Sequence, residues 1–273
     1  MTSIDDLLTI MATLRDPNHG CDWDKAQTFA SIVPHTLEEA YEVADAIERE
    51  HWSDLKDELG DLLFQIVFYS QLGREQNRFD FDDVVNAVCD KLTRRHPHVF
   101  GPKDADGKPL TTPDWEGIKA QERAEKMPST QSSSVLDGVT QGLPALTRAH
   151  KLQKRCARVG FDWPTVAPVI DKVREELEEV EHELAQTHVD ATRVEEEIGD
   201  LLFAIVNVAR HLGTDAEQAL RVANQKFERR FRGVESHLRD NGKNIQQCQL
   251  DELESAWQAV KKEAREHSER EPM

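Results

Sequence analysis

Apolar residues recur along the chain at spacings of three and four, which is the pattern of helices that bury one face. In the first half this pattern predicts helices over residues 3–15, 36–50, 54–76, 80–95 and 112–125. In the second half it predicts helices over residues 144–158, 166–186, 191–212, 215–240 and 251–266. We therefore predict an all-α fold built from helical bundles.

Two local features add detail to this prediction. Thr36 can cap the second helix, and Glu39, three residues further on, completes a capping box. Residues 62–68 and 201–206 are too apolar for an outer face, so we expect them to be the most buried segments of the fold.

The sequence of the first half returns in the second half. Five blocks recur in the same order at an offset of about 140 residues, which indicates a tandem duplication. The matched blocks are Gly20–Trp23 with Gly160–Trp163, Glu38–Glu42 with Glu175–Glu179, Glu58–Phe64 with Glu197–Phe203, Lys91–Arg95 with Lys226–Arg230, and Trp115 with Trp257. A polar, Ser-rich stretch separates the copies. We predict domains over residues 1–126 and 139–273, joined by a linker over 127–138.

Composition narrows the class of protein further. Charged residues make up 32% of the chain and aromatic residues 6%, which suits long amphipathic helices. The net charge of −18 argues against nucleic acid or an anionic membrane as a partner. It does not argue against a phosphorylated ligand that is held through a metal ion. The sequence offers no signal peptide, membrane span or CxxC pair, so we predict a cytoplasmic protein.

Acidic residues are spaced as a metal site requires. Glu39 and Glu42 lie three apart on one predicted helix, and Glu58 and Asp61 lie three apart on the next, so each pair shares a face. A short connection makes these helices antiparallel neighbours, which brings the four carboxylates together. The second copy repeats the arrangement with Glu176, Glu179, Glu197 and Asp200. Oxygen ligands in this number suit Mg²⁺, with Mn²⁺ as a substitute.

A single acidic run of this kind is most often only a solvated helix face. Glu58 and Asp61, however, lead directly into an apolar run, and Glu197 and Asp200 do the same. Carboxylates at the edge of a core are costly unless they are paired or bind a metal. Because both copies place them there, we favour the metal site.

A cationic block follows the acidic motifs in each copy. It comprises Lys91, Arg94 and Arg95 in the first copy and Lys226, Arg229 and Arg230 in the second. Lys and Arg suit phosphate groups, although such residues can also merely offset a helix dipole. Trp257 either stacks on a base or closes the core.

Together these motifs resemble the MazG family of nucleoside triphosphate pyrophosphohydrolases, and the resemblance extends from the first helix to about Lys261. It implies an all-α homodimer that uses Mg²⁺ to cleave NTPs and dNTPs into the monophosphate and pyrophosphate, clearing surplus or noncanonical nucleotides. It implies that the eight carboxylates are metal ligands. The nucleotide contacts that it implies are Lys172, Glu175, Glu176, Arg193, Glu196, Lys226, Arg229, Arg230 and Trp257.

The two copies differ near their carboxylates. Lys172 and Arg193 lie one helical turn before Glu176 and Glu197, whereas the first copy has His35 and Asp54 at these places. We therefore predict that the second copy is the main catalyst and that the first is weaker, narrower or regulatory. Glu175 and Glu176, with Glu38 as the counterpart of Glu175, are the candidate catalytic residues, and Glu175 or Glu38 would orient the attacking water.

Two other functions stay open at this point. One is a narrower enzyme with the same helical carboxylate site, such as a dUTPase-like or phosphoribosyl-ATP pyrophosphohydrolase. The other is an acidic helical scaffold that binds proteins or regulates them. A scaffold predicts no metal dependence of thermal stability, and it leaves the repeated cationic block unexplained.

Overall fold

The computed structural model describes residues 3–104, 106–108, 117–118, 122 and 134–270, with side chains up to residue 263. Within these residues every regular element is helical, which confirms the all-α prediction. The chain divides into two compact units, residues 1–126 and 127–273. The linker over 127–138 stays a prediction, since residues 127–133 lie outside the described part. None of the described helices is both long and apolar enough to cross a membrane.

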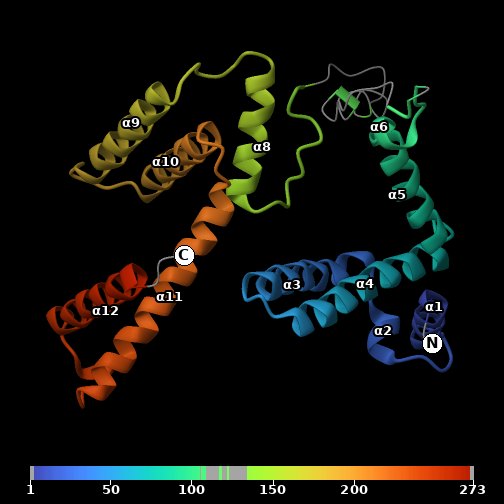
Figure 1. Cartoon of the computed structure of the whole chain (residues 1–273), viewed down its shortest axis with the longest axis horizontal. Coiled ribbons are helices and arrows are strands. Elements are labelled where there is room, and N and C mark those ends of the chain that lie inside the picture. Colours follow the sequence, from blue (N-terminus) through green and yellow to red (C-terminus); the bar gives the residue numbers. More distant parts are fainter. Residues whose placement is uncertain (1–2, 105, 109–116, 119–121, 123–133, 271–273) are drawn as a thin grey trace. The chain divides into compact units, whose positions relative to one another are not determined.

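The first unit is organised around one helical hairpin. Its elements are α1 (Ile4–Leu14), α2 (Asp22–Ala26), α3 (Phe29–Glu48), α4 (Trp52–Glu75), α5 (Phe81–Arg95) and α6 (Pro97–Phe100). Helices α3 and α4 form the hairpin, α1 packs on α4, and α5 continues from the C-terminal end of α4 (Figure 1). The helix predicted over 112–125 lies outside the described residues apart from positions 117–118 and 122.

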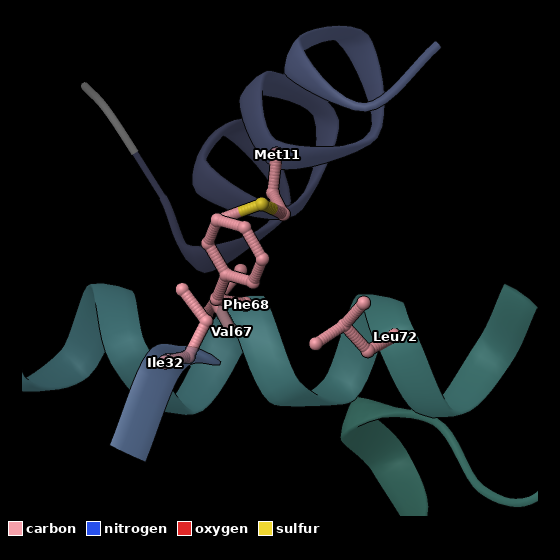
Figure 2. Packing of buried hydrophobic residues seen from close by; sticks show 5 residues of the cluster. All are labelled: Met11, Ile32, Val67, Phe68 and Leu72. Atoms are coloured by element: carbon pink, nitrogen blue, oxygen red, sulfur yellow. The ribbon is translucent and has the colours of Figure 1, made fainter. Parts of the chain in front are cut away.

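The core of the first unit lies where α1, α3 and α4 meet. Figure 2 shows Met11 of α1 and Ile32 of α3 packed on Val67, Phe68 and Leu72 of α4. The guanidinium of Arg15 lies 5.2 Å from the centre of the Phe68 ring, and its Nη2 is 2.7 Å from Glu75. This core ties α1 to the end of α4 that lies away from the acidic motifs.

The predicted start of the second helix is wrong. Helix α3 begins at Phe29, where Thr28 and Ser31 form the capping box that the sequence analysis placed at Thr36 and Glu39. Pro34 lies inside the helix, where it removes one backbone donor without ending the helix. Thr36 is therefore a helical residue, and its hydroxyl hydrogen-bonds to the Ile32 carbonyl and the Tyr69 hydroxyl.

The second unit repeats the hairpin. Its elements are α8 (Ala145–Arg158), α9 (Val166–Leu184), α10 (Ala191–His211), α11 (Ala216–Asp240), the 3₁₀ turn η1 (Ile245–Gln247) and α12 (Leu250–Arg270). Helices α9 and α10 form the hairpin, and α8 packs against both α10 and α11. Helix α11 runs away from the hairpin and pairs with α12 (Figure 1).

The expectation that both apolar runs are the most buried segments of the fold holds for one face of each helix only. Val67 and Phe68 are inaccessible to solvent, but Leu63 is 37% exposed. In the second unit Val206 is inaccessible, whereas Leu202 is 47% exposed. A hairpin within one chain covers only one side of α4 or α10, so the other side keeps its apolar residues at the surface.

Candidate active site

Each hairpin brings acidic residues from its two helices together. In the first unit, oxygen atoms of Glu39 on α3 and of Glu58 and Asp61 on α4 lie within 4.8 Å of one another. In the second unit the same holds for Glu176 and Glu179 on α9 and Glu197 on α10. The spacing of three along antiparallel helices produces this convergence. Three carboxylates this close offer a ligand set for a divalent cation.

The fourth predicted member of each acidic quartet lies near its cluster. Glu42 lies close enough to Glu39 to raise the pKa of its carboxyl. Asp200 lines the same cleft as Glu176 and Lys172. The predicted sets of four therefore gather around each hairpin seam, with three members in closest contact.

The carboxylates of each cluster hold protons more tightly than isolated ones. Burial raises the pKa of Glu39 above its ordinary value, and the charges of Asp61 and Glu42 raise it further. Burial followed by the charges of Glu42 and Asp61 raises the pKa of Glu58. For Glu179, a hydrogen bond with Glu176 and then burial raise the pKa. A cation bound among these oxygens would relieve the part of each shift that comes from the neighbouring carboxylate charges.

The second cluster has a cation of its own. Lys172 Nζ lies 2.7 Å from Glu176 and 2.8 Å from Glu175, and these hydrogen bonds raise the pKa of Lys172. Glu176 is buried, while Glu175 and the neighbouring Glu196 are exposed. At the matching position the first unit has His35, whose Nδ1 lies 3.8 Å from the exposed Glu38. The two clusters therefore differ in local charge.

Arg193 does not turn toward the carboxylate cluster. Its Nη2 lies 2.9 Å from Glu183, a buried carboxylate one turn beyond Glu179 on α9. Asp54 holds the matching place in the first unit, where it pairs with Arg49 and His51. The charge difference predicted at this position is therefore present, but in the structure Arg193 balances Glu183.

The cationic blocks lie apart from the carboxylates of their own unit. On α11, the block of Lys226, Arg229 and Arg230 begins about 15 Å from the N-terminal end of the helix. This helix leads away from the α9–α10 hairpin (Figure 1). Lys91, Arg94 and Arg95 lie in the last turns of α5, beyond the end of α4 that is remote from Glu58. The distance between block and cluster could not be predicted from the sequence, because it depends on the directions of α5 and α11.

Two further groups of predicted nucleotide contacts are engaged by other residues of the chain. Glu122 accepts hydrogen bonds from both Arg94 and Arg95, so these two guanidinium groups are already paired within the chain. Trp257 is half-buried between α11 and α12, with its ring centre 5.4 Å from that of Phe227. Within the chain, Trp257 therefore closes the α11–α12 core.

A cleft of about 700 Å³ opens beside the second cluster. Gly160 ends α8 with a φ of 86°, a conformation that favours glycine, and directs the chain into Phe161, Asp162 and Trp163 along the cleft. The remaining wall comes from α8, α9 and α10 and from Leu136 before α8, and the cleft borders Lys172, Glu176 and Asp200. An apolar hollow next to a metal-type cluster suits a nucleoside attached to phosphates.

The other polar residues of this cleft had no predicted role. Asp162 accepts hydrogen bonds from Arg210 at 2.5 Å and His211 at 3.0 Å, which lower the pKa of Asp162. Arg210 also donates to Asn207 Oδ1 at 2.7 Å. The recurrence of Gly160–Trp163 was the available signal, but it served only to detect the duplication.

The first unit fills the equivalent place. In the register that aligns Glu58 and Asp61 with Glu197 and Asp200, Phe68 occupies the position of Asn207. Phe68 is fully buried in the core of Figure 2. At this position the amide of Asn207 in the second unit therefore corresponds to a packed phenyl ring in the first.

The fold and the sites define an all-α tandem protein with two acidic, metal-type centres. A family model described as the MazG nucleotide pyrophosphohydrolase domain matches residues 27–100 and 165–234. The chain is 56% identical over 263 residues to the nucleoside triphosphate pyrophosphohydrolase of Escherichia coli K12, covering 96% of this chain and 98% of the relative. It is 39% identical over 257 residues to the nucleoside triphosphate pyrophosphohydrolase/pyrophosphatase MazG of Thermotoga maritima, covering 94% and 95%.

The chain belongs to the MazG family, and the family model matches it twice, once in each hairpin unit. It is thus an enzyme of the nucleotide pyrophosphohydrolase class, which confirms the resemblance seen in the acidic motifs.

Proposed function

We propose that this enzyme hydrolyses NTPs and dNTPs to the monophosphate and pyrophosphate, with Mg²⁺ as cofactor and the second unit as main catalyst. The observation that carries the proposal is the convergence of Glu176, Glu179 and Glu197 beside a cleft that also contains Lys172 and Asp200. Four free cysteines fit a role on the nucleotide pool of the reducing cytoplasm.

Glu176, Glu179, Glu197 and Asp200 would hold Mg²⁺, or Mn²⁺ in its place. When bound, the metal lowers the pKa of water and neutralises phosphate charge. Water would attack the α-phosphorus as the bond to the β-phosphate oxygen breaks. Glu175 is exposed beside Glu176 and would orient this water, while Lys172 would balance charge on the phosphates.

We further propose that the enzyme is a homodimer. Ile198, Leu202 and Ile205 form an exposed apolar stripe on α10, at helical spacings of four and three. Leu59, Leu63 and Ile66 repeat it on α4 at the matching positions. Stripes of this kind are costly in water unless a partner covers them. A second chain would also supply the cations of Lys226, Arg229 and Arg230 that α11 carries away from its own cluster.

Unequal activity of the units follows from three differences. Beside the first cluster of Glu39, Glu42, Glu58 and Asp61, His35 stands at the position of Lys172 and Phe68 at the position of Asn207. In addition, Glu122 accepts hydrogen bonds from Arg94 and Arg95. We propose that the first unit binds metal weakly or regulates the second, with Glu38 a minor participant.

The test is pyrophosphate release from a panel of NTPs and dNTPs with Mg²⁺, comparing wild type with Glu176→Gln and Glu39→Gln. These matched variants each remove one carboxylate charge at equivalent positions. We expect Glu176→Gln to lower kcat by about 100-fold or more, since it removes a transition-state contact, and Glu39→Gln to retain most activity.

The opposite ranking would overturn the assignment of the second unit as main catalyst. Activity on dUTP alone would favour a narrower dUTPase-like enzyme over a broad one. Absence of turnover with either metal would favour the acidic scaffold.

A further inference from the structure

The cleft of the second unit contains a buried amide oxygen without a partner. Gln153 on α8 lines the cleft and is 7% exposed. Its Nε2 donates to the Phe203 carbonyl of α10 at 2.8 Å. Its Oε1 is fully buried and meets no donor in the part of the chain that the structure describes. A buried acceptor left unpaired is costly, so its presence in a cleft points to a donor that arrives with a ligand.

Asn207 offers the complementary group on the same wall. It is 9% exposed, and its Oδ1 accepts from Arg210 Nε at 3.0 Å and Nη2 at 2.7 Å. Its Nδ2 donates to no atom among the described residues, which leaves one amide donor available in the cleft. Asn207 follows Phe203 by one helical turn, so it lies on the face of α10 that Gln153 of α8 contacts.

The orientation of both amides is fixed by their partners. A carbonyl oxygen only accepts, so Gln153 must present its NH₂ group to Phe203 and keep its oxygen on the other side. A guanidinium only donates, so Asn207 must present its oxygen to Arg210. Asp162 holds Arg210 in turn at 2.5 Å. The cleft therefore offers one acceptor and one donor of defined position.

We infer that Gln153 Oε1 and Asn207 Nδ2 read the edge of the nucleobase, accepting from an exocyclic amino or ring N–H group and donating to a neighbouring ring nitrogen or carbonyl. This inference rests on the proposed function and names the specificity residues of that site. Phe161 and Trp163 on the cleft wall supply the apolar surface that a base requires.

The test uses nucleotide pairs that differ by one hydrogen-bonding group. To remove the donor, the exocyclic amino group, ATP is compared with purine riboside triphosphate and CTP with the triphosphate of 2-pyrimidinone riboside. To remove the acceptor, the ring nitrogen, ATP is compared with 1-deaza-ATP and CTP with 3-deaza-CTP. For the preferred base, we expect wild type to favour the complete base by about 10- to 100-fold in kcat/KM for each missing group.

Each variant should abolish only the preference for the base group that the substituted residue contacts. Gln153→Met is nearly isosteric and should bring the ratio for the amino group close to one, while the ratio for the ring nitrogen is unchanged. Asn207→Leu should do the reverse. This crossed pattern separates base reading from a general loss of folding, which would lower both substrates of a pair alike.

Gln65→Met is the matched control. Gln65 is also a buried glutamine with an unpaired Oε1, but it lies in the first unit on α4, and its substitution should leave both ratios unchanged. Equal kcat/KM ratios in wild type and Gln153→Met would overturn the inference but leave the proposed function standing. A wild type that hydrolyses the complete and the altered bases equally well would do the same. A wild type that hydrolyses no nucleotide would overturn the proposed function with it.

Discussion

Glu122 in the first unit bridges two arginines with a single carboxylate. Each of its oxygens accepts from one guanidinium, Oε1 from Arg94 at 2.8 Å and Oε2 from Arg95 at 2.6 Å. Two arginines around one anion are also the arrangement that binds a phosphate group. In the register that aligns Trp115 with Trp257, the second copy has Ala264 at this position. The first unit therefore contains its own substitute for a phosphate.

We expect Glu122→Gln to destabilise the first unit in a pH-dependent way. The hydrogen bonds from Arg95 and Arg94 lower the pKa of Glu122 from 4.5 to about 2. A carboxyl with a depressed folded-state pKa stabilises the fold above its unfolded pKa, and this contribution is lost as pH falls toward the folded value. The variant should melt below wild type at neutral pH, and the difference should shrink as pH falls below 4.5. Thermal melts over a pH series measure it, and a constant difference would contradict the assignment.

The sequence predicted residues whose role depends on local spacing. Glu39, Glu58 and Asp61 meet because a separation of three fixes their faces before any tertiary contact is known. The contacts of Arg193 with Glu183 and of Arg94 with Glu122 could not be predicted, because a long side chain chooses among several partners within reach. Asn207 was missed for a related reason, since a single amide on an apolar helix face gives no pattern.

The α9–α10 hairpin carries electrostatic repulsion across its seam. Glu176, Glu179 and Glu197 approach within 4.8 Å, and Lys172 is bound to only one of the three. Without a cation, the hydrogen bond with Glu176, burial and the neighbouring charges raise the pKa of Glu179, so its carboxyl releases its proton at a higher pH than an isolated one. With a cation, the same oxygens would pull α9 and α10 together.

Mg²⁺ should therefore raise the Tm of the second unit by about 5–10 °C at a concentration about 100 times its Kd. Because the pKa of Glu179 is raised above 4.5, the metal-free hairpin loses stability as pH rises through the folded-state value, and metal competes with this proton. The Mg²⁺-induced shift should grow between about pH 5 and about pH 8. Calorimetry measures it, with Glu178→Gln on the same helix as a control that keeps the shift. An equal shift in Glu179→Gln would count against the site.

Long elements were predictable and short ones were not. Apolar periodicity gave α4, α9 and α10 to within a few residues, because many turns contribute to the signal. Helices α2 and α6 span 5 and 4 residues, too few for a period to show. The start of α3 was missed because Pro34 and Thr36 together suggest a helix end and a cap, although tertiary packing continues the helix through both.

At the scale of the whole molecule, the repeated apolar stripe points to an assembly of two chains. Ile198, Leu202 and Ile205 on α10 match Leu59, Leu63 and Ile66 on α4. The tandem duplication was evident from the sequence, since ordered repeats need no structure to be detected. Which face of each apolar run is covered could not be predicted, because periodicity alone does not distinguish a core inside the chain from one shared with a partner.

Leu202→Glu should shift the enzyme from a dimer toward the monomer mass of 31.1 kDa. A charge in the middle of an apolar contact would have to be buried without a partner, which opposes association. Light scattering after size-exclusion chromatography measures the mass. Leu250→Glu, at an exposed leucine that starts α12, is the control that should leave the mass unchanged. A monomeric wild type would remove the proposal.

Because Phe68 fills the core of one half and the matching place in the other half is hollow, the two halves of the enzyme should respond differently when nucleotides are scarce. A filled core keeps its contacts whatever the surroundings contain, whereas the hollow beside Asn207 gains its missing contacts only from a bound molecule. The second half should therefore loosen when nucleotides are scarce, while the first half does not change. A protease that cuts transiently opened chains would then attack the second half first. The lifetime of the enzyme would thus follow the supply of its own substrate.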